Sequence, residues 1–565
     1  MGSASLRRLN ARLITVGVLL ILAWVGIGYR LVVVQALEAE VYADHGLVQR
    51  LQREVLAADR GTIFDRDGRE LAVTVDSVTV YANPREIEDP ITVARLLAPL
   101  LRLNMLDVLD ALSTDGTFAY VARQIETRDA EPVRAAQLPG IYFLTEPKRV
   151  YPMGDLTGHV IGFVRADDNQ GLEGLEYQYD EPLAGVPGEL LVERDPQGRT
   201  IPQGEYRVVP AEPGSDLVLT IKTEIQFAAQ QALLKAIERT GAEGGSIVVL
   251  DPATGEILAM ANLPTFDPND RRGADASDFR NRAVTDAFEP GSTQKVITIS
   301  AALEAGHATP DMLFEIPTSI ERGETVFRDF TSHPSELTVT GIVAHSSNLG
   351  TIMLGEMLGS RELHRYLHAF GLGEPTGVDF PGETSGLLRT PENWCEVNCV
   401  ASTSIGYGVS VTTLQMAMVY ATVANDGLWV QPHLVQEIVD GKGARVPVVP
   451  LQRRVIDADT ARSMRLMLEE VVSGGTGAYA AVEGYRVGGK TGTTEIYLTE
   501  EQRYSEDDVV ASFIGMAPID DPRVVVAVVL DRPKEDASGG KGAAPVFAEV
   551  TLSALHQLGV PPDGQ

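Results

Sequence analysis

The segment FEPGSTQKVITISAALEAG, residues 288–306, places a proline and a glycine directly before a serine, and a lysine follows three residues later. Pro290 and Gly291 interrupt the segment before it, and TQKVITISAALEAG is typical of a helix. Ser292 therefore stands where a helix begins, and Lys295 follows one turn later on the same face. A serine in this position is either a helix cap or a nucleophile with an amine beside it.

Length and charge limit the classes of protein to which the chain can belong. Its 565 residues are enough for about two to four domains, and a hydrophobic content of 44% is ordinary for a globular protein. The formal net charge is −31. Because a protein that neutralises phosphates needs an excess of Lys and Arg, we expect no nucleic-acid partner and no polybasic membrane surface.

The N-terminal sequence predicts a membrane anchor. Residues 13–29 carry no charge, and apolar sequence resumes after Arg30, so that residues 13–34 approach the length of about 20 residues that crosses a bilayer. A cleaved signal peptide is the alternative, because Val34-Gln35-Ala36 could serve as a cleavage site. The apolar part of a signal peptide is normally about 7–15 residues long, which favours a retained anchor.

The residues before the anchor set its predicted orientation. Three arginines within residues 1–12 indicate a cytoplasmic tail and place everything after the anchor outside the cytoplasm. ATP and other cytosolic cofactors are not available there. Cys395 and Cys399 would lie in an oxidising compartment. Their spacing is compatible with a local disulfide and equally with two free thiols.

Residues 35–212 are predicted to form a loop-rich α+β region. Residues 36–60 have the composition of a polar helix that leaves the membrane. The runs RGTIFDRDGRELAVT and SVTVYANP are typical of short strands, with a turn at residues 65–68. Residues 96–112, LLAPLLRLNMLDVLDAL, are typical of a helix, and the glycine-rich sequence after residue 150 indicates loops.

Residues 213–565 are predicted to contain an antiparallel sheet covered by helices. A strand-like run at 215–221 leads into a helix at 222–241, and SIVVLDPATGEILAMAN follows as a hairpin with its turn at 252–255. Three further strand candidates lie within 485–531 and have short connections, which implies antiparallel neighbours. The sheet is thus expected to draw its strands from both ends of this region.

Three short patterns supply candidate chemistry. A serine hydroxyl is a weak nucleophile, and Lys295 can act as its base only if burial or another cation lowers the lysine pKa from about 10.4. Lys490, in a K-T-G sequence on a predicted strand, supplies a second cation, and the glycine leaves room for a substrate backbone. Ser346 and Asn348 supply another hydroxyl and an amide.

In this order the patterns S-x-x-K, S-x-N and K-T-G resemble those of class B penicillin-binding proteins, which are membrane-anchored peptidoglycan transpeptidases. FEPGSTQK, AHSSNLG and GGKTGTTE match that family beyond the minimal letters. RGTIFDRDGRELA, RVYPMGDLTGHVIG and GLEGLEYQYDEPLAG resemble its pedestal, or dimerisation-like, module, and RGTIFDRDG by itself predicts only a hairpin. The stretch SIGYGVSVTTLQMAMVYATVANDG resembles part of its transpeptidase domain.

This resemblance implies an α+β multidomain fold with a single transmembrane helix. The implied parts are a cytoplasmic tail at 1–12, an anchor at 13–34, a pedestal at 35–212, and a transpeptidase domain at 213–565. The last would have the penicillin-binding and β-lactamase-like serine acyltransferase fold. The chain would lie in the cytoplasmic (inner) membrane with its catalytic domain on the periplasmic side.

The resemblance also implies acyl transfer. The implied catalytic residues are Ser292, Lys295, Ser346 and Lys490, and the implied substrate-binding residues are Asn348, Thr491, Gly492 and Thr493. Ser292 would attack the penultimate D-Ala of a donor stem peptide, release the terminal D-Ala and form an acyl-enzyme that a neighbouring stem peptide resolves. Lys295 is our choice of general base, and the backbone N–H groups of Ser292 and Thr493 would form the oxyanion hole.

Substrates and partners follow from the same resemblance. Stem peptides on glycan strands made from a lipid-linked precursor would be the substrates, β-lactams would inhibit, and no cofactor or metal is expected. A polytopic glycosyltransferase of the shape, elongation, division and sporulation (SEDS) type would bind the anchor and pedestal, together with divisome proteins. The absence of a large pedestal insertion favours septal division over elongation.

Other functions fit parts of the sequence. A β-lactamase shares the nucleophile, but the anchor and the large N-terminal region disfavour it. A non-catalytic sensor or scaffold that binds wall peptides or β-lactams is the alternative from a different class. GYRVGGKT, residues 484–491, matches a P-loop in letters, although the sequence after Lys490 favours a strand over the required helix.

Two further patterns are weaker. His364 and His368 have the spacing of a zinc pair on a helix, but no third ligand is evident, so we expect no metal site. A second S-x-x-K at residues 538–541 has two internal glycines, which indicate a loop.

Overall fold

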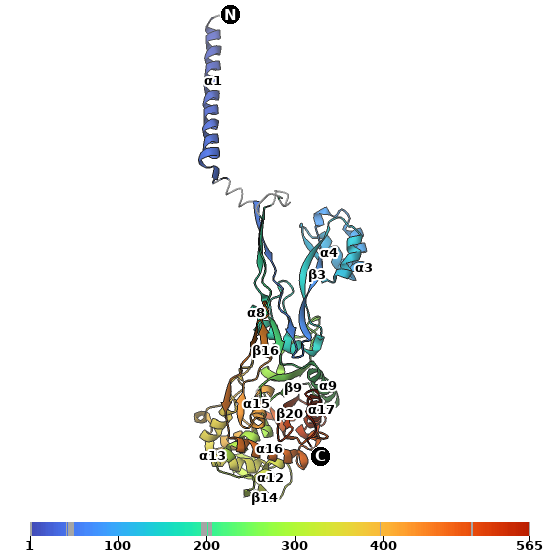
Figure 1. Ribbon diagram of the computed structural model, residues 1–565, viewed down its shortest axis with the longest axis vertical. Coiled ribbons are helices and arrows are strands. Elements are labelled where there is room, and N and C mark those ends of the chain that lie inside the picture. Colours follow the sequence, from blue (N-terminus) through green and yellow to red (C-terminus); the bar gives the residue numbers. More distant parts are fainter. Residues whose placement is uncertain are drawn as a thin grey trace. The chain divides into compact units, whose positions relative to one another are not determined.

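The computed structural model describes residues 3–40, 42, 50–193, 201, 206–395, 397–498 and 501–563. These residues form two compact units (Figure 1). One contains Met1–Asp59 and Gly185–Pro213, and the other contains Arg60–Ala184 and Gly214–Gln565.

The smaller unit contains the apolar N-terminal helix and a three-stranded sheet. Helix α1 spans Ser3–Val32 and continues into a π-helical turn, and Leu9–Leu37 is long and apolar enough to cross a membrane. This confirms the expected apolar N-terminal helix, and no other helix among the described residues is long and apolar enough to cross a membrane. The sheet has the order β1-β6-β7, with both pairs antiparallel. Its strands are β1 (Leu51–Leu56), β6 (Gly188–Glu193) and β7 (Tyr206–Val209).

The prediction of a polar helix over residues 36–60 is wrong at its C-terminal end. Leu51–Leu56 is a strand, with Leu51 opposite Glu193 and Leu56 opposite Gly188. Strand formation here depends on a partner far away in the sequence, which local composition does not reveal. The part of this prediction at residues 41 and 43–49 lies outside the described residues.

In the larger unit, residues 60–184 form an α+β module. They are part of the region 35–212 that was expected to be α+β, and the described remainder of that region belongs to the smaller unit. The predicted turn at 65–68 joins β2 to β3, and SVTVYANP continues β3 instead of forming a separate strand. The strands belong to a seven-stranded sheet that also includes β8 (Asp216–Leu219), β16 (Val435–Val439) and β17 (Arg445–Pro447). The strands of the module are β2 (Ile63–Phe64), β3 (Glu70–Ala82), β4 (Ala119–Ile125) and β5 (Ile141–Val150).

The single helix predicted over residues 96–112 is two helices. Arg102 ends the first one in a left-handed conformation with φ of 55°, and the Asn104 side chain caps the second by accepting a hydrogen bond from the Leu106 N–H. The helices of the module are α3 (Pro90–Leu101), α4 (Met105–Ser113), α5 (Thr127–Ala135), α6 (Gly158–Ile161), α7 (Gly174–Gln178) and α8 (Asp180–Ala184).

The C-terminal region, residues 213–565, contains a five-stranded antiparallel sheet of order β10-β9-β21-β20-β19. The first two strands come from the start of the region and the other three from its end, which confirms the predicted assembly. The hairpin turn at 252–255 is also as expected. The strands are β9 (Gly244–Leu250), β10 (Ile257–Leu263), β19 (Gly488–Leu498), β20 (Arg503–Ala517) and β21 (Val524–Asp531).

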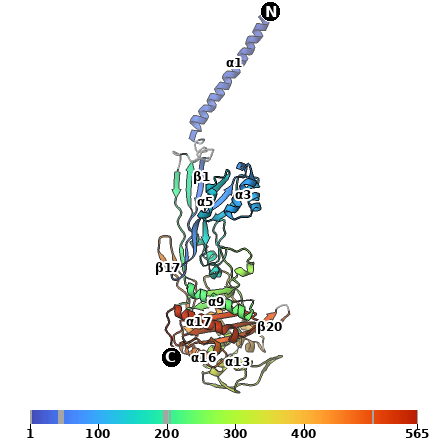
Figure 2. The same cartoon turned by 90° about the vertical axis from the view of Figure 1, so that its right-hand side faces the viewer.

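Helices bury both faces of this sheet. Side chains alternate along β9, so that Ile247 and Val249 face a core shared with α9 and α17, whereas Val248 and Leu250 face the core shared with α11 and α15. Figure 2 shows α9 and α17 lying across the sheet. The helices are α9 (Thr223–Thr240), α11 (Lys295–Glu304), α15 (Thr413–Ala424), α16 (Ala458–Ser473) and α17 (Ala544–Gln557).

Smaller elements connect these layers. The strands are β8 (Asp216–Leu219), β11 (Leu313–Glu315), β12 (Ile320–Arg322), β13 (Thr325–Phe327), β14 (Glu336–Thr338), β15 (Leu428–Val430), β16 (Val435–Val439), β17 (Arg445–Pro447) and β18 (Gln452–Arg454). The helices are α10 (Arg282–Thr285), α12 (Val339–Ala344), α13 (Asn348–Ala369) and α14 (Cys399–Ser404).

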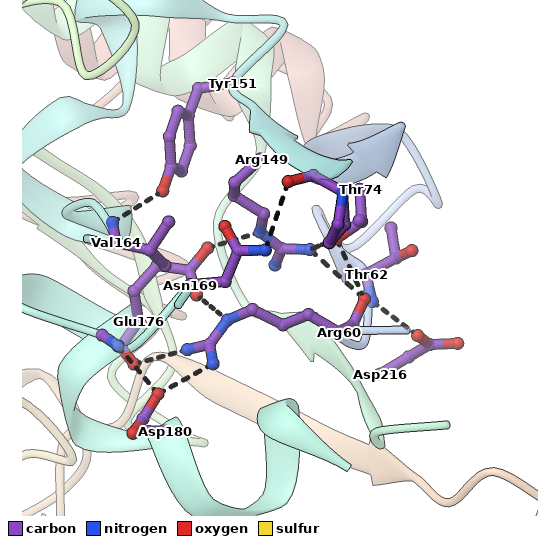
Figure 3. Close-up of polar contacts among 12 residues, drawn as sticks. Arg60, Thr62, Thr74, Arg149, Tyr151, Val164, Asn169, Glu176, Asp180 and Asp216 are labelled. Atoms are coloured by element: carbon purple, nitrogen blue, oxygen red, sulfur yellow. Dashed lines mark hydrogen bonds and ion pairs between the residues drawn. The ribbon is translucent and has the colours of Figure 1, made fainter. Parts of the chain in front are cut away.

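A buried ionic cluster joins the segments that resemble the family pedestal (Figure 3). The Glu176 carboxylate accepts hydrogen bonds from Arg60 Nε and Arg149 Nε, each at 2.7 Å. Arg60 Nη1 donates to Asp180 at 2.7 Å. Because Glu176 is fully buried and both arginines are nearly so, the cluster fixes β5, α7 and α8 to the chain before β2.

Candidate active site

Ser292 lies where the sequence predicts, at the start of a helix. It belongs to a 3₁₀ turn, Gly291–Gln294, which leads directly into α11. Gly291 has a φ of 51°, and a side chain there would collide with the Thr494 hydroxyl. The turn is therefore held against β19, and it leaves the Ser292 side chain partly exposed.

Lys295 points its amine into a fully buried site. Nζ donates to the Ser346 carbonyl at 2.7 Å and to Asn348 Oδ1 at 2.6 Å, with Ser346 Oγ at 3.4 Å. Burial, followed by the charge of Lys490, holds the pKa of Lys295 well below its usual range, against the opposing effect of Asp329. A lowered pKa favours the neutral amine, which is the form of lysine that can act as a base.

Ser346 connects the two lysines. Lys490 Nζ donates to Ser346 Oγ at 2.8 Å, on the turn between α12 and α13. Ser346 has a φ of 57°, a conformation that costs a non-glycine residue about 1–3 kcal/mol and is found preferentially at functional sites. The structure thus brings together the patterns around Lys295, Ser346 and Lys490, as predicted.

Lys490 lies on β19, the outer strand of the five-stranded sheet. Burial lowers the pKa of its amine to about 7. A side chain at Gly492 would collide with Ser512 Oγ and lie 3.0 Å from Thr293 Cγ2, so only glycine lets the strand approach the nucleophile turn this closely.

The predicted substrate-binding residues have different surroundings. Thr493 is exposed, whereas Thr491 is buried and its hydroxyl lies 3.0 Å from the Thr476 hydroxyl. The Asn348 amide is already engaged, because Nδ2 donates to the Arg328 carbonyl at 3.0 Å and Oδ1 accepts from Lys295. Asn348 therefore orients Lys295 in this structure, in addition to any contact with a donor peptide.

Sequence reasoning missed Asp329, which holds the second pattern in place. Its carboxylate accepts hydrogen bonds from the N–H groups of Asn348 and Leu349 and from Ser347 Oγ at 2.9 Å. His333 Nε2 lies 2.7 Å from the same carboxylate. Asp329 stabilises the N-terminus of α13 as an anionic cap, yet no sequence motif marked the loop that carries it.

The loop predicted at the second S-x-x-K is instead a π-helical turn, Gly539–Ala543. Gly539 starts this turn, and its N–H donates to Thr493 Oγ1 at 3.0 Å. A side chain on Gly539 would collide with the Gly492 carbonyl. The glycines therefore allow this segment to pack along β19 and hold the Thr493 side chain.

The rival patterns do not form the sites that they suggest. Lys490 continues a strand, so GYRVGGKT lacks the helix that a P-loop requires. The rings of His364 and His368 stack with centroids 6.3 Å apart, and within the described ranges no three His, Cys, Asp or Glu side chains form a metal-binding cluster. Cys395 and Cys399, whose pairing the sequence left open, form a disulfide with Cα atoms 5.3 Å apart.

The two lowered pKa values predict a bell-shaped pH dependence of acylation by penicillin. The rate should fall in acid as Lys295 takes up a proton, and it should fall above about pH 7 as Lys490 loses its charge. Stopped-flow labelling of the full-length protein with a fluorescent penicillin measures both limbs. Lys490→Arg keeps the positive charge and should remove the fall in rate above about pH 7. If the rate of the unchanged protein instead rises steadily into strong alkali, Lys490 does not act as the required cation.

Comparison with known proteins agrees with this geometry. Residues 245–552 match the penicillin-binding protein transpeptidase domain, and residues 55–219 match the penicillin-binding protein dimerisation domain. The chain is 36% identical over 560 residues to the probable peptidoglycan D,D-transpeptidase PenA of Neisseria meningitidis, covering 98% of this chain and 94% of that protein. It is 35% identical to peptidoglycan D,D-transpeptidase FtsI of Escherichia coli over 540 residues, covering 94% and 89%.

A solved structure shows the same fold. The crystal structure of penicillin-binding protein 3 from Mycobacterium tuberculosis in complex with aztreonam matches with a TM-score of 0.71 and 32% identity, covering 90% of this chain and 98% of that one. The antiparallel sheet, with a serine turn and two buried lysines, defines the class of serine acyltransferases. Within that class, the chain belongs to the class B penicillin-binding proteins.

Proposed function

We propose that this chain is a peptidoglycan D,D-transpeptidase that works through an acyl-enzyme on Ser292. The observation that carries the proposal is the position of the Ser346 hydroxyl, 2.8 Å from Lys490 Nζ and 3.4 Å from Lys295 Nζ. Two buried lysines around one hydroxyl favour a neutral Lys295 amine one turn from the nucleophile. The family membership and the D,D-transpeptidase names of the relatives support the same reaction.

In the first half-reaction Ser292 Oγ attacks the carbonyl carbon of the penultimate D-Ala, and Lys295 Nζ takes its proton. The backbone N–H groups of Ser292 and Thr493 stabilise the oxyanion, with an expected value of about 3–4 kcal/mol per donor. The C–N bond then breaks, and the proton passes through Ser346 Oγ to the leaving amine of the terminal D-Ala. Lys490, Thr491 and Thr493 bind the donor carboxylate.

In the second half-reaction an amine of another stem peptide attacks the acyl carbon. The new C–N bond forms as the bond to Ser292 Oγ breaks, and the proton lost by the amine returns to Oγ through Lys295. β-Lactams present a reactive carbonyl to the same serine and remain attached because no acceptor resolves them. The structure of the mycobacterial relative with aztreonam supports this extension.

Reconstituted cross-linking tests the proposed reaction. Full-length protein in detergent, given a stem peptide ending in D-Ala-D-Ala and an amine acceptor, should release D-Ala and form a cross-linked dimer, and prior treatment with penicillin should block both. Hydrolysis without dimers would indicate a carboxypeptidase. Rapid turnover of penicillin would indicate a β-lactamase, and no acylation at all would favour the sensor or scaffold.

We assign residues 1–12 to the cytoplasm, 13–34 to the anchor, 35–212 to the pedestal and 213–565 to a transpeptidase domain on the periplasmic side. The arginines before residue 13 support this orientation. The similarity to FtsI supports a septal role. A fluorescent fusion should therefore gather at midcell, and a sidewall distribution would favour elongation instead.

We further propose that α1 contacts a SEDS-type glycosyltransferase within the divisome. A Cβ added at Gly17, Gly26 or Gly28 would meet nothing within 4 Å, so this part of the helix can approach a partner helix closely. Gly17 and Gly28 lie on one face of α1, because eleven residues make about three helical turns. Replacing both by isoleucine should reduce recovery of the glycosyltransferase with this chain from detergent-solubilised membranes. Unchanged recovery would exclude this face of α1 from the interface.

A further inference from the structure

A cavity of about 660 Å³ lies in the larger compact unit, outside the proposed active site. Its walls come from β3, the β4–α5 connection, the end of β5, the loop that contains Asn169, and residues 268–271. This volume is within the range of small-ligand sites. The cavity adjoins the buried ionic cluster of Figure 3, because Arg149 belongs to both.

Arg149 leaves one hydrogen-bond donor unused at this cavity. The residue is only 6% exposed, and its Nε and Nη1 donate to Glu176 and to Thr74 Oγ1. Nη2 is buried and has no hydrogen-bond partner among the described residues. An unsatisfied donor of a buried guanidinium costs free energy unless a ligand or solvent accepts from it.

Asn169 leaves an acceptor unused in the same cavity wall. Its Nδ2 faces the Pro147 carbonyl at 3.5 Å, and because a carbonyl can only accept, the amide oxygen must point the other way. That oxygen, Oδ1, is buried and also lacks a partner within the described ranges. Two residues of the cavity wall thus each keep an enclosed polar atom without a partner among the described residues, a donor on Arg149 and an acceptor on Asn169.

The charge of the lining favours an anion. Four basic side chains line the cavity, against two acidic ones, in a chain whose net charge is −31. Two of these bases are already paired, Arg128 with Glu126 at 2.6 Å and Arg149 with Glu176 at 2.7 Å. Lys148 and Arg271 therefore remain against one acid, Asp76. Lys148 is half-buried on β5 and forms no ion pair with a described residue, and Arg271 stacks on Phe163 instead of meeting a carboxylate.

We propose that this cavity binds the carboxylate end of a peptide. The carboxylate accepts from Arg149 Nη2 and pairs with Lys148 and Arg271, while the last peptide N–H donates to Asn169 Oδ1. A peptide C-terminus carries a carboxylate and a peptide N–H close together, whereas a simple anion carries only the negative charge. The proposal rests on the proposed function in one respect, because stem peptides that end in a free carboxylate are the substrates and products of that reaction.

Binding to a protein with a blocked active site tests the proposal. The probe is a fluorescent, N-acetylated peptide that ends in D-Ala-D-Ala, added to full-length protein whose Ser292 is acylated by penicillin, and anisotropy reports binding. The carboxylate peptide should bind saturably, and the same peptide with a C-terminal amide should bind roughly tenfold more weakly or worse. Mass spectrometry checks acylation first. If no acylation occurs, the proposed function has failed, and the unmodified protein is used with the cavity variants to locate any binding.

Variants locate the binding. Lys148→Ala and Asn169→Ala should each weaken binding roughly tenfold, whereas Lys235→Ala, which removes an exposed lysine on α9, should leave it unchanged. Arg149 is not replaced, because it also holds Glu176. Absence of saturable binding, equal binding of the acid and the amide, or binding that Lys148→Ala and Asn169→Ala leave intact would each overturn the proposal.

Discussion

Replacing Ser292 by alanine is expected to abolish covalent labelling of the chain by a fluorescent penicillin while the protein remains folded. The acyl bond can form only through a nucleophile that has a base beside it, and Lys295 is the buried amine one turn away. Neither Ser346 nor Ser347 can substitute. Ser346 Oγ is held by Lys490, and Ser347 Oγ donates to Asp329 and caps α13.

The second S-x-x-K pattern provides a matched control for this result. Ser538→Ala removes the serine from the same four-residue spacing, but Ser538 Oγ accepts from the Lys541 backbone N–H at 3.3 Å and caps a turn. This variant should still become labelled, with a mass increase of one penicillin per chain. Labelling that persists in Ser292→Ala, measured after denaturation to remove bound but unreacted penicillin, would refute the acyl-enzyme assignment.

Local sequence predicted the fold well where short-range chemistry determines it. The hairpin at 252–255 has a turn sequence between two apolar runs, and the strands after Lys490 have short connections that force antiparallel pairing. The strand Leu51–Leu56 was missed because its partner, Gly188–Glu193, lies more than a hundred residues away. The break at Arg102 was missed because the apolar pattern continues across it.

In the candidate active site, too, contacts between distant segments could not be predicted from local sequence. The patterns around Ser292, Lys295, Ser346 and Lys490 are short and could be recognised in the sequence, and the structure brings Lys295 and Lys490 to Ser346. The catalytic roles of the four residues stay predictions. Asp329 accepts a hydrogen bond from Ser347 Oγ, and it lies in a loop whose sequence, RDFTSH, matches no recognised motif. Its role arises only from tertiary contact with the N-terminus of α13, which a single sequence does not reveal.

Sequence patterns indicate no chemical role for the pedestal segments, yet three of these segments meet at one buried carboxylate. RGTIFDRDG supplies Arg60, RVYPMGD supplies Arg149, and GLEGLEYQYD supplies both Glu176 and Asp180. Charged residues are rarely buried unless they are paired. One carboxylate shared by two arginines therefore explains why each of these separate segments contains a charged residue that its local structure does not require.

Glu176→Ala is therefore expected to lower the free energy of unfolding of the larger unit by about 3–5 kcal/mol, because it leaves two buried guanidinium groups with only part of their hydrogen bonding. Full-length protein in detergent should lose penicillin labelling at a lower urea concentration than the parent. Glu181→Ala, an exposed acid on α8, should change stability by no more than about 0.5 kcal/mol. If Glu176→Ala resists urea as well as Glu181→Ala does, the ionic cluster does not hold the pedestal segments together, and apolar packing around α7 and α8 must do so.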